Sequence, residues 1–324
     1  MTATVEQESF FTETKNPEVA FLWLEITGVC NLKCVHCYAE SGPAGQRDSV
    51  GTRRWVALLQ EAAALGVRAV QFIGGEPLVH PDIAALLEEA RALGLESEIF
   101  SNLTYVRESL WCTFKEQRVS LATSFYSCNS SVHDQITQRT GSWTQTVTNI
   151  KRAVEYGLPL RVGIIDIRPD QDIKETTNFL RGLGVLNIGT DRMRGIGRGA
   201  KAVSDPCPAD ELCGACTGGK LAIDQNGQAH PCVFARWLNV GNVRDMSLAA
   251  VAGSGELASA RQLLDAAFAS RPKYYSSTPC HPDAATCGPG GCNPNCTPNP
   301  TISTPDPTIC TPNCTPTCNP AFPP

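Results

Sequence analysis

The stretch Cys30-Asn31-Leu32-Lys33-Cys34-Val35-His36-Cys37-Tyr38 decides the fold, because it places three cysteines within eight residues. It follows the apolar run 21–26, which is bounded by Thr27 and Gly28 and predicts a buried strand. A cubane of four irons and four sulfurs usually takes four thiolates, so a loop that supplies three leaves one iron open. The sequence therefore predicts a metal site at the C-terminal end of a strand.

A second motif, Gly74-Gly75-Glu76-Pro77, follows another strand-like run at 67–73. Paired glycines allow the backbone to approach a ligand closely, and the carboxylate of Glu76 can balance an ammonium group. Between the motifs, apolar residues at helical spacing predict one helix near residues 55–65, with Gly66 as its C-terminal cap. The two motifs are therefore one β-α unit apart.

With both motifs in this order, the chain resembles the radical S-adenosylmethionine superfamily, whose three cysteines have this spacing, with an aromatic residue or His (here His36) before the last. The resemblance implies a 4Fe-4S cluster on Cys30, Cys34 and Cys37, whose open iron chelates S-adenosylmethionine. Reductive cleavage of this cofactor would give a 5′-deoxyadenosyl radical that abstracts hydrogen from a substrate. Taken singly, the cysteines with His36 are also compatible with a structural zinc site, and the glycine motif with a turn.

The resemblance also implies the cofactor-binding residues. The glycine motif would hold the amino group, and polar side chains after the strands would contact the ribose and carboxylate. The expected residues are His36, Tyr38, Gly74, Gly75, Glu76, Pro77, Asn102, Ser124 and Arg139. Cys128, after the fourth predicted strand, is hypothesised to donate hydrogen in an epimerisation, with an inert buried thiol as the alternative. Cys112, beside Trp111 in a predicted helix, is expected to be buried.

Alternating strand and helix patterns in the first two hundred residues predict an α/β fold with a parallel sheet. Strands are predicted at 21–26, 67–73, 95–100, 119–125, 160–167 and 186–190, and further helices near 83–93, 106–117, 144–155 and 173–183. Six repeats match the partial (β/α)6 TIM-like barrel that the resemblance implies, with ligands beyond the carboxyl ends of the strands. Residues 133–143 are expected to form the loop before the next helix.

The second half of the chain holds eleven of the sixteen cysteines, from Cys207 onward, which predicts a domain boundary near residues 195–201. A hairpin turn predicted at 224–227 folds Cys232 back toward Cys213 and Cys216. This resembles the SPASM extension, or its shorter Twitch relative, which bind auxiliary iron-sulfur clusters; a zinc ribbon is the alternative. Further candidate ligands are Cys207, Cys280, Cys287, Cys292 and Cys296. The spacing of the last four departs from the SPASM pattern, so one auxiliary cluster is expected and a second stays open.

The predicted organisation is an N-terminal extension at 1–19, a barrel at 20–200, an auxiliary cluster domain at 201–296 and a Pro/Cys-rich tail at 297–324. The tail cannot build a hydrophobic core, so it is expected to be disordered or organised by metal.

The net charge of −5 argues against a nucleic-acid partner. The basic cluster at 192–198 is the local exception, and we expect a small-anion loop or a solvated face there. No apolar run approaches the roughly 20 residues that cross a bilayer, and no signal peptide is evident, so the chain is expected to be cytoplasmic with reduced thiols.

The resemblance points to function through the extension. Members with SPASM or Twitch domains mostly modify ribosomally made peptides, so we expect an oxidoreductase-type peptide maturase that forms crosslinks or epimerises residues. The alternatives are a radical epimerase or dehydrogenase of a sugar, aminocyclitol or amino alcohol, and an iron-sulfur electron-transfer or metal-binding protein. About twenty residues precede the first strand, too few for a winged-helix leader-binding domain, and this favours the small-molecule alternative. A separate leader-binding protein would remove the objection to a peptide substrate. An electron donor such as a flavodoxin or ferredoxin is the other expected partner.

Overall fold

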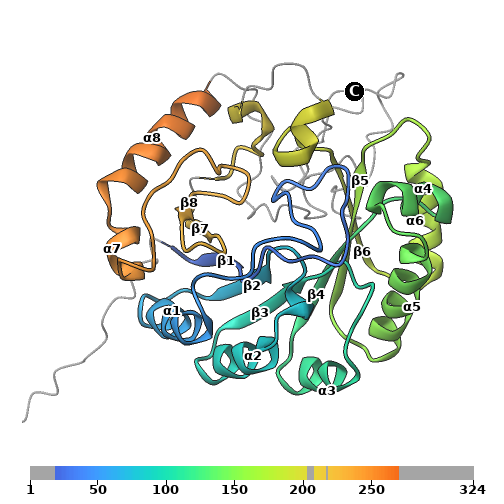
Figure 1. Cartoon of the computed structure of the whole chain (residues 1–324), viewed down its shortest axis with the longest axis horizontal. Coiled ribbons are helices and arrows are strands. Elements are labelled where there is room, and N and C mark those ends of the chain that lie inside the picture. Colours follow the sequence, from blue (N-terminus) through green and yellow to red (C-terminus); the bar gives the residue numbers. More distant parts are fainter. Residues whose placement is uncertain (1–18, 203–207, 217, 270–324) are drawn as a thin grey trace, which may run out of the picture.

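The computed structural model describes residues 19–202, 208–216 and 218–269. Their centre is one eight-stranded sheet with the strand order β6-β5-β4-β3-β2-β1-β7-β8. The first six strands are all parallel, and helices cover the outside of the curved sheet (Figure 1). The prediction of an α/β fold with a six-repeat partial barrel is confirmed.

The repeats follow the predicted order closely. Their elements are β1 (Phe21–Glu25), α1 (Thr52–Ala64), β2 (Ala69–Ile73), α2 (Ile83–Ala92), β3 (Glu96–Phe100), α3 (Glu108–Glu116), β4 (Ser120–Phe125), α4 (Ser130–Thr137), α5 (Ser142–Glu155), β5 (Leu160–Asp166), α6 (Ile173–Gly182) and β6 (Asn187–Arg192). Helix α4 corrects the loop expected at 133–143. Its N-cap is Asn129, whose side chain accepts hydrogen bonds from the backbone N–H groups of Ser131 and Val132.

Two further strands extend the sheet beyond β1. Strand β7 (Lys220–Ile223) pairs in parallel with β1, and β8 (Ala229–His230) returns antiparallel to β7. Gly227 has a φ of +81° in the connecting turn, a conformation that favours glycine. The predicted hairpin is therefore present, and it continues the barrel sheet. The remaining elements are η1 (Pro77–Val79), η2 (Gly197–Ala202), η3 (Pro208–Glu211), α7 (Leu248–Ala252) and α8 (Gly255–Ala269).

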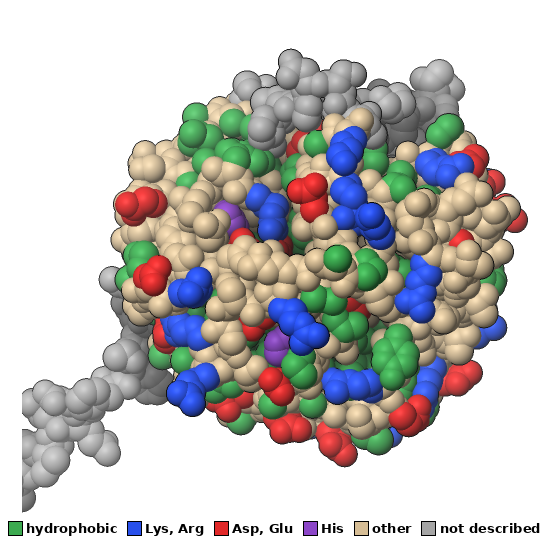
Figure 2. Space-filling view, in the orientation of Figure 1, with side chains coloured by type: hydrophobic (Ala, Val, Ile, Leu, Met, Phe, Trp, Pro, Cys, Tyr) green, Lys and Arg blue, Asp and Glu red, His purple; other side chains and the backbone are tan. Residues whose placement is uncertain are grey.

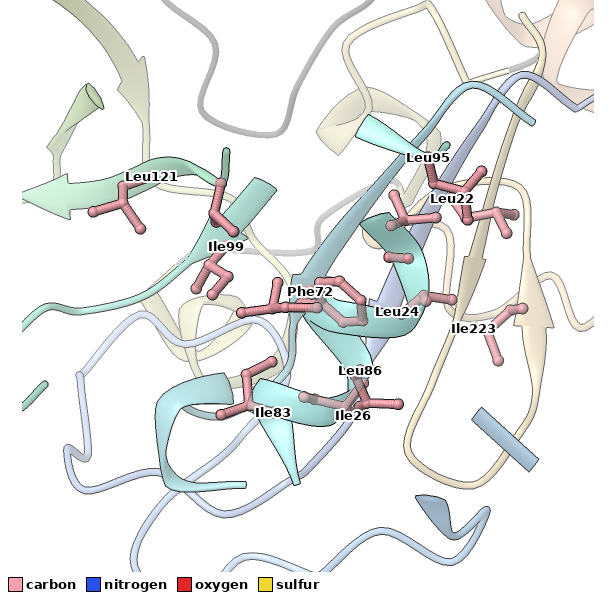
Figure 3. Close-up of a cluster of buried hydrophobic side chains, with 14 of the residues drawn as sticks. Leu22, Leu24, Ile26, Phe72, Ile83, Leu86, Leu95, Ile99, Leu121 and Ile223 are labelled. Atoms are coloured by element: carbon pink, nitrogen blue, oxygen red, sulfur yellow. The ribbon is translucent and has the colours of Figure 1, made fainter. Parts of the chain in front are cut away.

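The main core lies between the sheet and the outer helices (Figure 3). Side chains alternate along a strand, so Leu22 and Leu24 face this core while Trp23 belongs to a second apolar cluster on the other face. Burying a leucine of this kind contributes about 1.5–3 kcal/mol to stability. One face of β1 thus packs against the outer helices, and the other face points to the inside of the barrel.

Cys112 corrects a second expectation. It lies in α3, where Trp111 and Phe114 turn inward and are fully buried, whereas the Cys112 side chain is exposed. Within the described residues, no helix is long and apolar enough to span a membrane.

Candidate functional site

A pocket lies at the carboxyl ends of the barrel strands and encloses about 1080 Å³ of empty space, part of it open to solvent. Its walls include all three cysteines of the first motif and both glycines of the second. The lining residues are Cys30, Leu32, Cys34, His36, Cys37, Tyr38, Gln71, Ile73, Gly74, Gly75, Phe100, Asn102, Ser124, Tyr126, His133, Thr137, Thr146, Ile165, Asp191, Arg192, Arg194 and Phe234.

The two motif loops are held together by their backbones. The N–H of Gly75 donates to the carbonyl of Thr27 at 2.6 Å, and the N–H of Glu76 donates to that of Val29 at 2.9 Å. A Cβ on Gly74 would lie 2.3 Å from the Thr27 oxygen. The paired glycines therefore let the backbone approach the cysteine loop, as well as line the pocket.

Arg198, from η2, supports the cysteine loop on its other side. Its guanidinium donates to the carbonyl oxygens of Cys34 at 2.7 Å and Ser41 at 2.8 Å, and its N–H donates to that of Cys37 at 3.0 Å. The C-terminal end of α4 adds a further contact, since the N–H of Val35 donates to the carbonyl of Ile136. The loop is thus positioned by residues more than a hundred positions away in sequence.

All three arginines of the basic cluster at 192–198 have partners within the protein. Arg192 forms an ion pair with Glu211, and Arg194 forms one with Asp191 in which both side chains are 6% exposed. Arg198 is bonded to the cysteine loop as above. Arg194 is buried and Arg192 is exposed, so the cluster is partly solvated, and the expectation of a small-anion site there stays a prediction.

The thiols of Cys30 and Cys34 are buried and lie close to other groups that can carry negative charge. Burial raises the pKa of Cys30 to about 12, helped by the neighbouring charges of Glu76 and Cys37. Burial also raises the pKa of Cys34, which a hydrogen bond from Tyr126 opposes. Three thiolates here need compensating positive charge, and the irons of a cluster supply it. The residues present therefore fit an iron-sulfur cluster.

Glu76 is fully buried, and its carboxylate accepts hydrogen bonds from the N–H groups of Leu78 at 3.0 Å and Asn102 at 2.8 Å. Burial raises the pKa of Glu76 to about 7. The Asn102 amide in turn donates to Asn31 at 2.8 Å and lies 3.7 Å from the Cys30 sulfur. Glu76 thus joins the glycine motif to the end of β3 and the cysteine loop.

Six of the nine predicted cofactor-binding residues line the pocket: His36, Tyr38, Gly74, Gly75, Asn102 and Ser124. Glu76 lies outside the lining and accepts a hydrogen bond from the N–H of Asn102. Pro77 and Arg139 lie outside the lining; Arg139 donates to the carbonyl of Asn31 at 3.3 Å. Cys128 also lies outside it, and its N–H donates to Thr176 of α6. Their predicted roles stay predictions.

Gln71 is a pocket residue that the sequence analysis missed. It is fully buried in β2, where its Nε2 donates to Glu98, and Glu98 forms an ion pair with Arg161 at 2.8 Å. A carboxylate accepts only, so this bond fixes the amide orientation and leaves Oε1 as the free acceptor. That oxygen has no hydrogen-bond partner among the residues that the structure describes. A buried Gln inside an apolar strand was the available signal.

The auxiliary cysteines converge as predicted. Cys216 shares side-chain hydrogen bonds with both Cys213 and Cys232, which raise its pKa, while its bond to Cys213 lowers the pKa of that thiol. Among the described residues, no three His, Cys, Asp or Glu side chains are grouped as the ligands of a single ion, at this site or at the first motif. Soft thiol donors suit an iron-sulfur cluster. Cys207, Cys280, Cys287, Cys292 and Cys296 lie outside the described residues.

Side-chain contacts connect the two cysteine sites. Phe234, two residues after Cys232, packs edge-to-face on Tyr38 with ring centroids 5.1 Å apart. Arg236 donates to the buried Glu25 at the end of β1 at 2.7 Å. Burial raises the pKa of Glu25, against the attraction of Arg236. The second site is therefore packed onto the loop that carries the first.

Two family models match the chain: the radical SAM superfamily over residues 24–180 and the SPASM iron-sulfur cluster-binding domain over residues 211–287. Among curated proteins, the antilisterial bacteriocin subtilosin biosynthesis protein AlbA of Bacillus subtilis is 30% identical over 58% of this chain and 42% of its own length. The Fe-coproporphyrin III synthase of Methanosarcina barkeri is 26% identical over 62% of this chain and 50% of its own. The chain thus spans about half the length of these relatives.

Among solved structures, Streptococcus suis SuiB bound to S-adenosylmethionine matches with a TM-score of 0.63 and 18% identity, over 75% of this chain and 68% of that one. The same protein bound to its precursor peptide SuiA matches with a TM-score of 0.64. This likeness supports the partial barrel fold. The two matched family models, over segments that contain the paired motifs and the auxiliary cysteines, show that the chain belongs to the radical SAM superfamily and carries a SPASM-type iron-sulfur domain.

Proposed function

We propose that this protein cleaves S-adenosylmethionine reductively and uses the resulting radical to mature a ribosomally synthesised peptide. The observation that carries the radical step is that Cys30, Cys34, Cys37, Gly74 and Gly75 all line one pocket at the barrel mouth. When bound, a 4Fe-4S cluster on the three thiolates supplies the electron that cleaves S-adenosylmethionine to methionine and the 5′-deoxyadenosyl radical.

The residues of the chain have defined tasks in this proposal. The glycine motif and Asn102 hold the cofactor against the cysteine loop, and His36, Tyr38 and Ser124 shape its binding site. The apolar lining, which includes Ile73, excludes water and so protects the radical from quenching. Pro77 and Arg139 support the same site from outside the lining.

We assign Cys213, Cys216 and Cys232 to one auxiliary iron-sulfur cluster in the proposed domain at 201–296. The side-chain hydrogen bonds that link Cys216 to both other thiols support this assignment. The packing of Phe234 on Tyr38 gives the auxiliary site a second task, which is to close one side of the pocket.

The peptide substrate rests on the relatives. One is a bacteriocin biosynthesis protein, and the barrel fold is shared with a protein solved with its precursor peptide. We infer that crosslinking or epimerisation of a short gene-encoded peptide is the reaction, with a reduced flavodoxin or ferredoxin as electron donor and a separate protein that binds the leader.

Anaerobic reconstitution with iron and sulfide, followed by dithionite and S-adenosylmethionine, tests the radical step. We expect 5′-deoxyadenosine by mass spectrometry, and much less from Cys34→Ala; its absence from a cluster-loaded preparation would overturn the proposal. Short peptides encoded beside the gene are then added in D2O. A loss of 2 Da indicates a crosslink and a gain of 1 Da indicates epimerisation.

A further inference from the structure

The cysteine loop separates two cavities. Cys30, Cys34, His36 and Cys37 line the inner pocket, whereas Lys33 and Val35, from the same loop, line a groove on the outer side. The Val35 side chain is 40% exposed. The outer groove therefore borders the chain segment that carries Cys34, on the side away from the substrate pocket.

The outer groove is basic. Its lining residues are Lys33, Val35, Gln138, Ile167, Arg168, Met193, Arg198 and Lys201, four of them cations and none acidic. Figure 2 shows Lys and Arg side chains gathered in this part of the mouth, near the upper ends of β5 and β6. The whole chain has a net charge of −5, so the groove has the opposite sign to the molecule.

The four cations are not equally available. Arg198 is bonded to the carbonyls of the cysteine loop, and Arg168 pairs with Asp170 at 2.7 Å. Lys33 and Lys201 are exposed, and no ion pair forms at either within the described residues. Val35, Ile167 and Met193 add an apolar floor between these charges. An apolar centre surrounded by basic side chains is typical of a surface that binds an acidic protein.

We propose that this groove docks an acidic electron-donor protein that carries a reduced flavin or iron-sulfur cluster. The inference rests on the proposed radical chemistry, which consumes one electron per cleavage. One electron passes from the reduced partner to the cluster held by Cys34 and its neighbours; the partner is oxidised by one electron and no atom is transferred. Entry through the outer face leaves the inner pocket closed around the substrate.

The test compares the full-length double variant Lys33→Glu/Lys201→Glu with wild type and with Lys151→Glu/Lys174→Glu. The control changes two exposed lysines of α5 and α6, outside the groove, by the same total charge. Binding of an acidic flavodoxin and of a ferredoxin is measured by calorimetry at low and high salt. Formation of 5′-deoxyadenosine is measured with the reduced donor and, separately, with dithionite, which needs no docking.

We expect the groove variant to bind the donor about tenfold or more weakly, with a smaller salt dependence, and to lose donor-driven 5′-deoxyadenosine in proportion. The donor-driven rate of each protein is divided by its own dithionite-driven rate, so that any effect of Lys33→Glu on the adjacent Cys34 cancels, and this ratio should fall about tenfold in the groove variant alone. Equal weakening in the control, or no weakening in the groove variant, overturns the proposal. The proposal is also overturned if the wild-type protein binds poly-glutamate but binds neither flavodoxin nor ferredoxin, because the groove would then be a site for an acidic peptide segment. Failure of wild type with dithionite instead overturns the proposed function.

Discussion

Gly75 and Val29 approach so closely that a Cβ on Gly75 would lie 2.2 Å from the Val29 carbonyl oxygen and 2.5 Å from its carbon. Both contacts are with backbone, so no side-chain rotation relieves them. The next residue, Glu76, donates its N–H to the same carbonyl at 2.9 Å. The two sequence motifs thus form one packed unit whose spacing permits only glycine.

We expect Gly75→Ala to separate the loops, lower stability by about 2 kcal/mol or more, and reduce iron incorporation. Gly182→Ala is the matched control, because a Cβ there meets no atom within 4 Å. It lies at the end of α6, so alanine should leave stability unchanged or raise it slightly. Thermal unfolding and iron analysis check both. A Gly75→Ala protein with wild-type stability and iron content would contradict this prediction, because the cysteine loop and the glycine motif could then move apart without loss of stability.

Arg198 is expected to be needed for cluster assembly, because one guanidinium joins Cys34 and Ser41 through their carbonyl oxygens. Arg198→Ala should lower iron and sulfide content several-fold after identical reconstitution. Arg198→Lys keeps the charge but has no planar fork, so we expect intermediate content. Arg53→Ala, at an exposed position of α1, serves as control. Unchanged iron content in Arg198→Ala would leave the loop positioned by α4 alone.

The sequence identified the parts of the site that depend on local spacing. The cysteine loop, the glycine motif and the six strands were found because apolar periodicity and motif spacing are short-range signals. The convergence of Cys232 on Cys213 and Cys216 followed from one turn motif. These features required no knowledge of distant contacts.

Long-range contacts were not predictable in the same way. Nothing local shows that Arg198 reaches the Cys34 carbonyl or that Arg192 pairs with Glu211, so the protein partners of the basic cluster were not foreseen. Helix α4 was missed because its eight residues are mostly polar and its start depends on the Asn129 cap. Cys112 was expected inside because its neighbour Trp111 is, although adjacent helical residues point in different directions.

Gln71→Met should separate stability from function. It removes the buried Oε1 that has no partner, whose burial costs about 1–3 kcal/mol, and leaves Glu98 paired with Arg161. We therefore expect the metal-free variant to be at least as stable as wild type. Peptide modification should fall more than uncoupled 5′-deoxyadenosine formation, because Gln71 is one of the residues that line the pocket.

The control for this change is Gln60→Met, since Gln60 also donates to a glutamate, Glu89 at 2.8 Å, but on the exposed surface. Thermal unfolding and the ratio of modified peptide to 5′-deoxyadenosine measure the two effects. A Gln71→Met enzyme with an unchanged ratio would mean that Gln71 serves packing alone.

His133 gives the protein a pH-dependent stability. It is 1% exposed against Phe125 and Tyr126, and its burial lowers its pKa to about 4. In the unfolded chain the pKa is about 6.5, so below pH 6.5 the unfolded state takes up a proton that the folded state does not. The free energy of unfolding therefore falls as the pH drops from 6.5 toward 4, by up to about 3 kcal/mol from this residue.

His133→Phe removes that contribution, and denaturant titrations of the metal-free proteins at pH 7 and pH 5 measure it. Wild type should lose more stability between the two pH values than the variant, and equal losses would place the imidazole in contact with solvent.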